Sequence, residues 1–126
     1  MKIASTIARL LLGLLFVIFS LNFWLHFIPV PPPPEGSLAA GFMGAIYMSG
    51  YLTFVKVLEL TGGLLLLSGR YVNLALALLG PIVVNIVLFH VFLAKGGYPL
   101  PAVMGVLALV ALAGRADFKN ALWAAK

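Results

Sequence analysis

Apolar stretches long enough to cross a lipid bilayer recur along the whole chain. The first extends from Ile3 to Ile28, and about 20 helical residues suffice to cross the roughly 30 Å of hydrocarbon in a bilayer. Of the 126 residues, 63% are hydrophobic and only 9% are charged, a balance that a water-soluble domain of this size could not keep off its surface. We therefore predict an all-α fold in which residues 1–126 form a single integral membrane domain solvated by the lipid bilayer.

Prolines, glycines and charged residues divide this apolar sequence into segments. They predict four spans, at about residues 3–28, 51–68, 71–93 and 101–118. The first span should stop where the proline-rich arm begins at Pro29, because proline cannot continue a helix. Pro81 predicts a kink in the third span. The fourth span is short unless it continues past Arg115, whose side chain would then reach to the interface. The fold expected is a membrane-embedded four-helix bundle.

A short interfacial or re-entrant helix is expected between the first two spans. Ser37 can cap its start, and Phe42 and Ile46 then share one face. A cleavable signal peptide is the alternative for the beginning of the chain, since Lys2 precedes the apolar run and Ser37–Ala39 is similar to a cleavage site. The long segment with its proline arm between the apolar run and that site favours a membrane span instead.

The basic residues are distributed unevenly between the two ends of the four spans. One end has Lys2, Arg9, Arg70, Arg115, Lys119 and Lys126, whereas the other has only Lys95. Because lysine and arginine accumulate in cytoplasmic loops, both termini should be cytoplasmic. These residues stand singly and form no basic run, so the net charge of +5 does not indicate binding to nucleic acid.

Six polar residues lie within the apolar segments: Asn22, His26, Lys56, Glu59, Asn85 and His90. A charge inside a span costs roughly 2.5–3.5 kcal/mol, so it usually has a partner or a function. Lys56 and Glu59 are spaced i, i+3 on one helix face, which predicts an internal ion pair. That pair could be purely a packing and neutralising device. Gly62-Gly63, on the following turn, should allow a neighbouring helix to approach closely.

Counting along each helix places all six polar residues in the outer half of the membrane. This common depth predicts a polar cavity that opens to the outer face. Asn85 and His90 are five residues apart and would point about 140° away from each other on a straight helix, so both need not face that cavity. A lone histidine such as His26 is more often an ordinary residue at a wet helix end.

Two kinds of ligand could bind to these residues. Glu59, His26 and His90 could bind zinc or iron, but no His-x-x-His or Glu-x-x-His spacing supports this, and we predict no metal site. Several aromatic residues could stack on a quinone, although aromatics near an interface usually serve packing; they are Phe23, Trp24, Phe27, Phe89 and Phe92. The chain contains no cysteine and no autonomous catalytic motif, so any thiol or redox metal would have to come from a partner.

Three segments resemble the DoxX family of small bacterial membrane proteins. The string Lys56-x-x-Glu59-x-x-Gly62-Gly63 resembles one family segment, and Asn85-Ile86-x-Leu88-Phe89-His90 resembles another. The opening Arg9-Leu10-Leu11-Leu12-Gly13 is similar to the first span of the family. The resemblance covers nearly the whole chain.

This resemblance implies a four-helix protein of the bacterial cytoplasmic (inner) membrane, with Lys56, Glu59, Asn85 and His90 as motif positions. Relatives are named as subunits of thiosulfate:quinone oxidoreductase and of membrane complexes tied to oxidative stress. The function expected is therefore a small-molecule-binding subunit of a membrane redox or stress-response complex. The cofactor stays open, with quinone as one candidate, and a partner redox protein and a homo-oligomer are candidate partners. Enzyme activity would belong at most to the complex. The alternative is a non-enzymatic role, either as a carrier that moves a small substrate through the polar cavity or as an assembly or sorting factor whose proline arm binds a partner protein. A sorting role is known for distant relatives of the family, which are cargo receptors.

Overall fold

The computed structural model describes residues 2–29, 32–94 and 99–115. Every regular element in these ranges is helical, and the elements are α1 (Lys2–Leu25), α2 (Leu38–Met48), α3 (Tyr51–Ser68), α4 (Val72–Leu88), the π-helical segment η1 (Phe89–Ala94) and α5 (Pro99–Ala113). The prediction of an all-α fold is therefore confirmed for the described residues.

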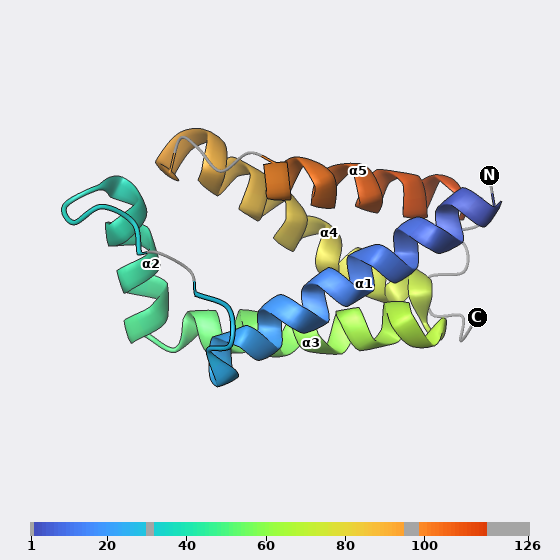
Figure 1. Cartoon of the computed structure of the whole chain (residues 1–126), viewed down its shortest axis with the longest axis horizontal. Helices are drawn as coiled ribbons and strands as arrows, with labels where there is room; N and C mark the ends of the chain where they lie inside the picture. Colours follow the sequence, from blue (N-terminus) through green and yellow to red (C-terminus); the bar gives the residue numbers. More distant parts are fainter. Residues whose placement is uncertain (1, 30–31, 95–98, 116–126) are drawn as a thin grey trace.

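The four longest α-helices pack side by side around a common core. Helix α1 lies against α3 and α5, and α4 also lies against α3 and α5. Helix α2 sits across one end, where it contacts α3 and η1 (Figure 1). The core consists of apolar side chains from all four packed helices, among them Leu12, Phe16, Leu66, Val72, Leu79, Met104 and Ala111.

Three helices are long and apolar enough to cross a membrane, and they are Lys2–Leu25, Tyr51–Ser68 and Val72–Ala94. The outer surface of the structure is also strongly apolar, with Ile3 78% exposed, Phe54 66% and Leu109 69%. Large apolar side chains that face outward on several helices are compatible with contact with a lipid bilayer. Helix α5 is shorter, with 15 residues, which gives a length of about 22 Å at 1.5 Å per residue.

The sequence predicted the bounds of α3 because glycine stands at both of its ends. Gly50 and Gly69 have φ values of 85° and 77°, in the left-handed region that favours glycine. The helix predicted to follow Ser37 is also confirmed as α2. The Ser37 hydroxyl oxygen accepts a hydrogen bond of 3.1 Å from the backbone N–H of Ala40, as an N-cap should.

The end of α1 differs from the prediction. The helix was expected to continue to Ile28, but it ends at Leu25, and His26 has a left-handed φ of 54°. The reason is a local contact made by Asn22, whose side chain binds both backbone groups of Ile28. These two bonds fold the chain back over the last turn of α1, so the helix ends before it reaches Pro29.

The fourth predicted span, 101–118, differs from the structure in two described places. Helix α5 begins at Pro99 and ends at Ala113, so the helix does not continue through Arg115 as expected. Gly114 forms a turn after the helix, and the Arg115 side chain turns inward to Asn73 at the start of α4 instead of reaching the interface. The remainder of that predicted span, 116–118, lies outside the described residues.

The third predicted span, 71–93, is continuous but changes its helix type. Pro81 lies inside α4, and the α-helix continues past it to Leu88. The chain then forms π-helical turns in η1. A π-helical segment inserted into a long helix alters the direction of the residues that follow it, and such segments occur frequently at functional sites.

The described basic residues follow the uneven distribution that the sequence indicates. Lys2, Arg9 and Arg115 line one common cavity, and Arg9 also contacts Gly69, which precedes Arg70. This end of the structure lies opposite α2 (Figure 1). Lys95, Lys119 and Lys126 lie outside the described residues.

Candidate functional site

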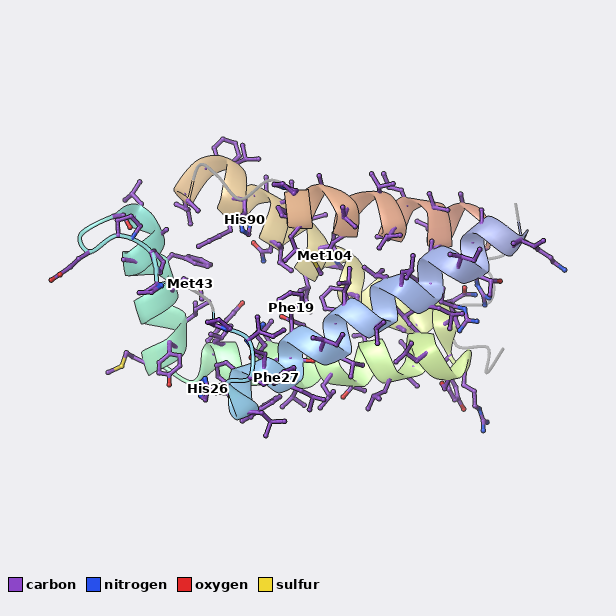
Figure 2. All side chains as sticks on the ribbon, in the orientation of Figure 1. Phe19, His26, Phe27, Met43, His90 and Met104 are labelled. Atoms are coloured by element: carbon purple, nitrogen blue, oxygen red, sulfur yellow. The ribbon has the colours of Figure 1, made fainter. Side chains whose placement is uncertain are left out.

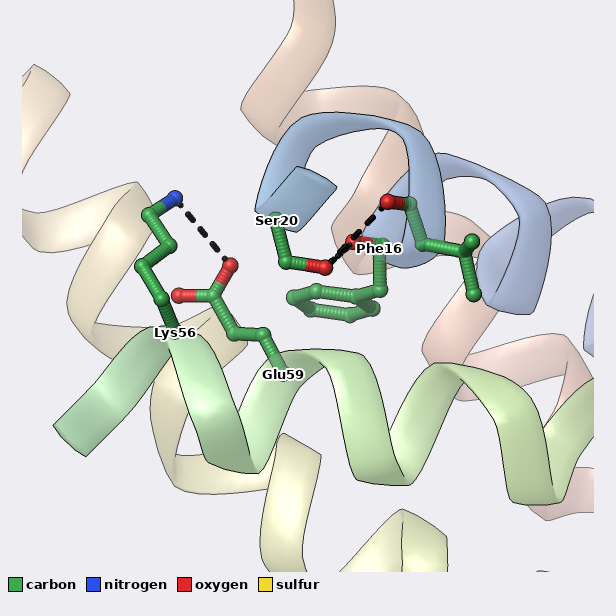
Figure 3. Close-up of polar contacts among 5 residues, drawn as sticks. Phe16, Ser20, Lys56 and Glu59 are labelled. Carbon is green, nitrogen blue, oxygen red and sulfur yellow. Dashed lines mark hydrogen bonds and ion pairs between the residues drawn. The ribbon is translucent and has the colours of Figure 1, made fainter. Parts of the chain in front are cut away.

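Lys56 and Glu59 form an ion pair on the inner face of α3, as their spacing predicts. The Lys56 Nζ lies 3.3 Å from Glu59 Oε1, and the side chains of the two residues are 20% and 6% exposed, respectively. Glu59 shares the buried face of α3 with Leu52, Gly62, Gly63 and Leu66. Figure 3 shows the pair beside α1.

The part of α1 that faces this pair carries Phe16 and Ser20 (Figure 3). Both residues are buried, and the Ser20 hydroxyl donates a hydrogen bond to the Phe16 carbonyl oxygen of its own helix. The Ser20 proton is therefore committed to the backbone. Only the lone pairs of its oxygen remain for a further donor.

Glycines bring the neighbouring helices close to the turn of α3 that follows the pair. A Cβ added to Gly63 would lie 3.0 Å from the Gly13 carbonyl oxygen of α1, and one added to Gly62 would lie 2.7 Å from Leu79 Cγ of α4. The close approach that Gly62-Gly63 predicts is therefore confirmed. This contact fixes α1 and α4 on either side of the buried face that carries Glu59.

The ion pair leaves hydrogen-bonding capacity on both of its members. Of the two carboxylate oxygens of Glu59, Oε1 has a hydrogen-bond partner and Oε2 has none within the described ranges, so Oε2 is available as an acceptor. The Lys56 ammonium has three N–H groups and uses one of them on Glu59. Because a fifth of the Lys56 side chain is exposed, its remaining donors are accessible from the edge of the bundle. The pair can thus offer two donors and one acceptor to a small molecule.

The two sequence-predicted site residues on α1 have different surroundings from this pair. Asn22 is buried, and its amide uses Oδ1 to accept from Ile28 N–H at 2.6 Å and Nδ2 to donate to Ile28 C=O at 3.1 Å. His26 is exposed at the end of the helix (Figure 2). The Asn22 side chain therefore stabilises the turn that follows α1, whereas His26 lies at the surface.

The two predicted residues on the α4–η1 segment form no hydrogen bond or ion pair with the pair in the described ranges. Asn85 is exposed, and His90 is partly buried with Nδ1 2.8 Å from the Ile86 carbonyl oxygen. The His90 ring lies edge-on against Phe89 at a centroid distance of 5.3 Å. Among the described residues, no hydrogen bond or ion pair joins Asn22, His26, Asn85 or His90 to Lys56 or Glu59. The structure thus brings together Lys56 and Glu59 alone of the six.

The aromatic residues that could stack on a quinone contact one another or lie at the surface. Phe23 packs edge-on against Trp24 at 5.2 Å and against Tyr47 of α2 at 6.1 Å. Phe89 packs against Phe42 of α2 at 5.7 Å. Two others are exposed, with Phe27 at 53% and Phe92 at 63%. Aromatic contacts therefore attach α2 to both α1 and η1.

Metal coordination has no geometric support in the part of the chain that the structure describes. No three histidine, cysteine, aspartate or glutamate side chains come together there. Glu59, His26 and His90, which the sequence offers as ligands, are not grouped around one point.

A second set of polar contacts, which the sequence did not reveal, lies at the opposite end from α2. Ser5 donates a 2.7 Å hydrogen bond to the Ala111 carbonyl of α5, and Arg9 donates to the Leu66 carbonyl of α3. Arg115 Nε donates to Asn73 Oδ1 at 2.5 Å. The spacing of Ser5 and Arg9, i and i+4, continues to the buried Leu12 and could have placed both on the inner face.

The chain matches no protein-family model, no curated protein and no solved structure. A function therefore has to be argued from the chemistry of the pair that α3 buries, and from the resemblance of the motif that contains it.

Proposed function

We propose that the chain is a DoxX-like membrane subunit that binds a quinone at the Lys56–Glu59 pair, within a redox or stress-response complex of the bacterial inner membrane. The observation that carries this proposal is the buried ion pair itself. It combines an accessible ammonium with a carboxylate oxygen, Oε2, that has no hydrogen-bond partner among the described residues. Asn85 and His90 are the other motif positions that the resemblance carries over, and neither forms a hydrogen bond or ion pair with Lys56 or Glu59 among the described residues.

The free-energy cost of placing two charges in an apolar helix favours a functional role for the pair over a purely structural one. Each charge in an apolar helix costs roughly 2.5–3.5 kcal/mol on insertion scales. Replacing a buried ion pair by apolar residues of similar volume is often neutral or stabilising. A bundle that only needed packing on this face of α3 could use leucine, as it does at Leu52 and Leu66.

The chemistry of a quinone suits the donors and acceptor of the pair. A quinone carbonyl oxygen can accept from the Lys56 ammonium, and a quinol hydroxyl can donate to Glu59 Oε2. Reduction of a quinone to a quinol consumes two electrons and two protons. Glu59 can pass the protons one at a time, with Lys56 stabilising its charged form. The electrons come from a partner protein that carries a metal or thiol, since this chain has no cysteine.

The membrane arrangement belongs to the same proposal. We infer that α5 crosses the membrane as a fourth span beside the three longer helices, because it packs along both α1 and α4. With four spans, the end that carries Lys2, Arg9 and Arg115 faces the cytoplasm. The pair then lies nearer the outer face, towards the end where α2 is found. The resemblance to DoxX proteins supports this arrangement, because Lys56, Glu59, Gly62 and Gly63 are positions of the shared motif.

The second candidate is a non-enzymatic role as a carrier or as an assembly or sorting factor. One observation favours contact with another protein: α2 exposes large apolar side chains, with Leu38 at 71% and Met48 at 83%. Such a surface could bind a partner redox protein, a sorted cargo protein or a second copy of this chain.

The decisive experiment is mass spectrometry of organic extracts from protein purified out of native membranes. The proposal predicts a co-purifying quinone that is lost in Glu59→Gln and retained in Glu35→Gln, a matched change at an exposed glutamate before α2. It also predicts that a co-purifying donor reduces this quinone. If both variants and the parent chain carry no quinone, while substrate accumulation in cells depends on the protein, the carrier function replaces the redox function.

A further inference from the structure

A cavity at the end of the bundle opposite α2 is lined by basic and hydroxyl side chains. It has a volume of about 160 Å³, and its lining residues are Lys2, Ser5, Thr6, Arg9, Gly114 and Arg115. No carboxylate is among these described lining residues. The residues come from the first turns of α1 and from the two positions after α5, and neither Lys56 nor Glu59 is among them. This cavity is therefore separate from the proposed quinone site.

Two of the basic residues present charge that the described structure does not neutralise. Arg9 donates to the Leu66 carbonyl, a neutral acceptor, and this bond uses one of the five N–H groups of its guanidinium. Within residues 2–29, 32–94 and 99–115, the carboxylate ion pair is that of Lys56 with Glu59, so neither Lys2 nor Arg9 has one. The Thr6 hydroxyl also has no hydrogen-bond partner there. Lys2, Thr6 and Arg9 can thus all donate to an anion.

An apolar groove adjoins this polar cavity on the outer, exposed side of α1. The groove has a volume of about 220 Å³ and is lined by Lys2, Ile3, Thr6 and Ile7. Lys2 and Thr6 line both hollows, so the polar and apolar parts are contiguous. Ile3 and Ile7 are 78% and 52% exposed, which leaves the groove open to the surroundings of the helix.

We infer that this composite hollow is a binding site for one anionic phospholipid. The phosphate group accepts hydrogen bonds from Lys2, Thr6 and Arg9, and the start of an acyl chain lies along Ile3 and Ile7. A free phosphate ion would use the polar cavity but would leave the apolar groove unfilled, so the pairing of the two hollows favours a lipid. Basic residues at the cytoplasmic surface attract anionic lipids in general; here the cavity and groove define a single bound molecule.

Native mass spectrometry of the detergent-solubilised full chain tests the site. We expect one phosphatidylglycerol molecule to be retained in preference to phosphatidylcholine with the same acyl chains. Lys2→Gln should weaken this retention about five-fold, from the loss of one charge near a phosphate. Thr6→Val should weaken it by a similar factor of about five, from the loss of one hydrogen bond without a change in charge. Both variants leave the contact between Arg9 and Leu66 intact, so the bundle should fold.

Arg70→Gln is the matched control, because Arg70 lies at the same end but does not line either hollow. It should change retention by less than about two-fold, as expected for an exposed charge. Equal losses in Arg70→Gln and Lys2→Gln would show a diffuse charge effect and overturn the site. Equal retention of the two lipids would overturn it as well. If inorganic phosphate displaces phosphatidylglycerol completely at equimolar concentration, the apolar groove contributes nothing and the lipid assignment is wrong.

Discussion

Gly13 of α1 and Gly63 of α3 lie backbone against backbone, so closely that a Cβ on Gly63 would be 3.0 Å from the Gly13 carbonyl oxygen. The same Cβ would be 3.0 Å from Val17 Cγ2 and 3.1 Å from Phe16 Cβ. A methyl group at this crossing therefore meets a rigid backbone and two packed side chains. The crossing holds α1 against the face of α3 that carries Glu59.

Gly63→Ala should destabilise the bundle by about 1–3 kcal/mol, the usual cost of forcing an extra methyl into a packed core. The measurement is thermal or denaturant-induced unfolding in detergent. Gly80→Ala in α4 is the control, because a Cβ there meets no atom within 4 Å. That change should be neutral or stabilising, since alanine favours helix more than glycine does. Equal destabilisation by both changes would show that the two helices do not touch at Gly63.

The ion pair should show energetic coupling between its two members. Lys56→Met leaves the Glu59 carboxylate without its partner, and Glu59→Leu leaves the ammonium without its own, so each single change should destabilise the protein. The double change removes both charges, and it should cost less than the sum by about 0.5–3 kcal/mol. A double-mutant cycle of unfolding free energies measures this coupling, and strictly additive losses would rule out the pair.

Asn22 should stabilise the end of α1 through its two bonds to Ile28. Asn22→Ala removes both, so hydrogen exchange at the Ile28 amide should accelerate about five-fold or more, from the loss of roughly one hydrogen bond's stabilisation. Asn85→Ala provides the control, because the Asn85 side chain is exposed and makes no hydrogen bond among the described residues. Exchange at Ile28 that is unchanged in Asn22→Ala would contradict this role.

Local signals in the sequence were sufficient for α2, for α3 and for the ion pair. Ser37 caps α2, glycines at positions 50 and 69 bound α3, and the i, i+3 spacing of Lys56 and Glu59 places both on one face. Each of these features depends on residues a few positions apart. Periodicity and turn chemistry describe such short distances well.

The features that the sequence did not reveal depend on the backbone path or on distant parts of the chain. Asn22 ends α1 early by binding Ile28, an interaction that competes with the proline signal that follows it. The inward turn of Arg115 depends on Asn73, which lies on another helix. The π-helical turns of η1 have no recognisable signal in their own residues. The similar depth of the six polar residues in the membrane was not sufficient to predict a shared site. Residues at equal depth, such as Glu59 and Asn85, can lie on different sides of the bundle and need not be in contact.

The central claim is that α1, α3, α4 and α5 all cross the membrane, with the Lys56–Glu59 pair inside them. Because the chain has no cysteine, single cysteines at Glu35, Arg70, Ala94 and Ala113 can be labelled in intact cells with a membrane-impermeant thiol reagent. Four spans predict labelling at positions 35 and 94 from outside, and at 70 and 113 only after the cells are permeabilised. Labelling of position 113 in intact cells would show that α5 does not cross, and would contradict the four-span bundle.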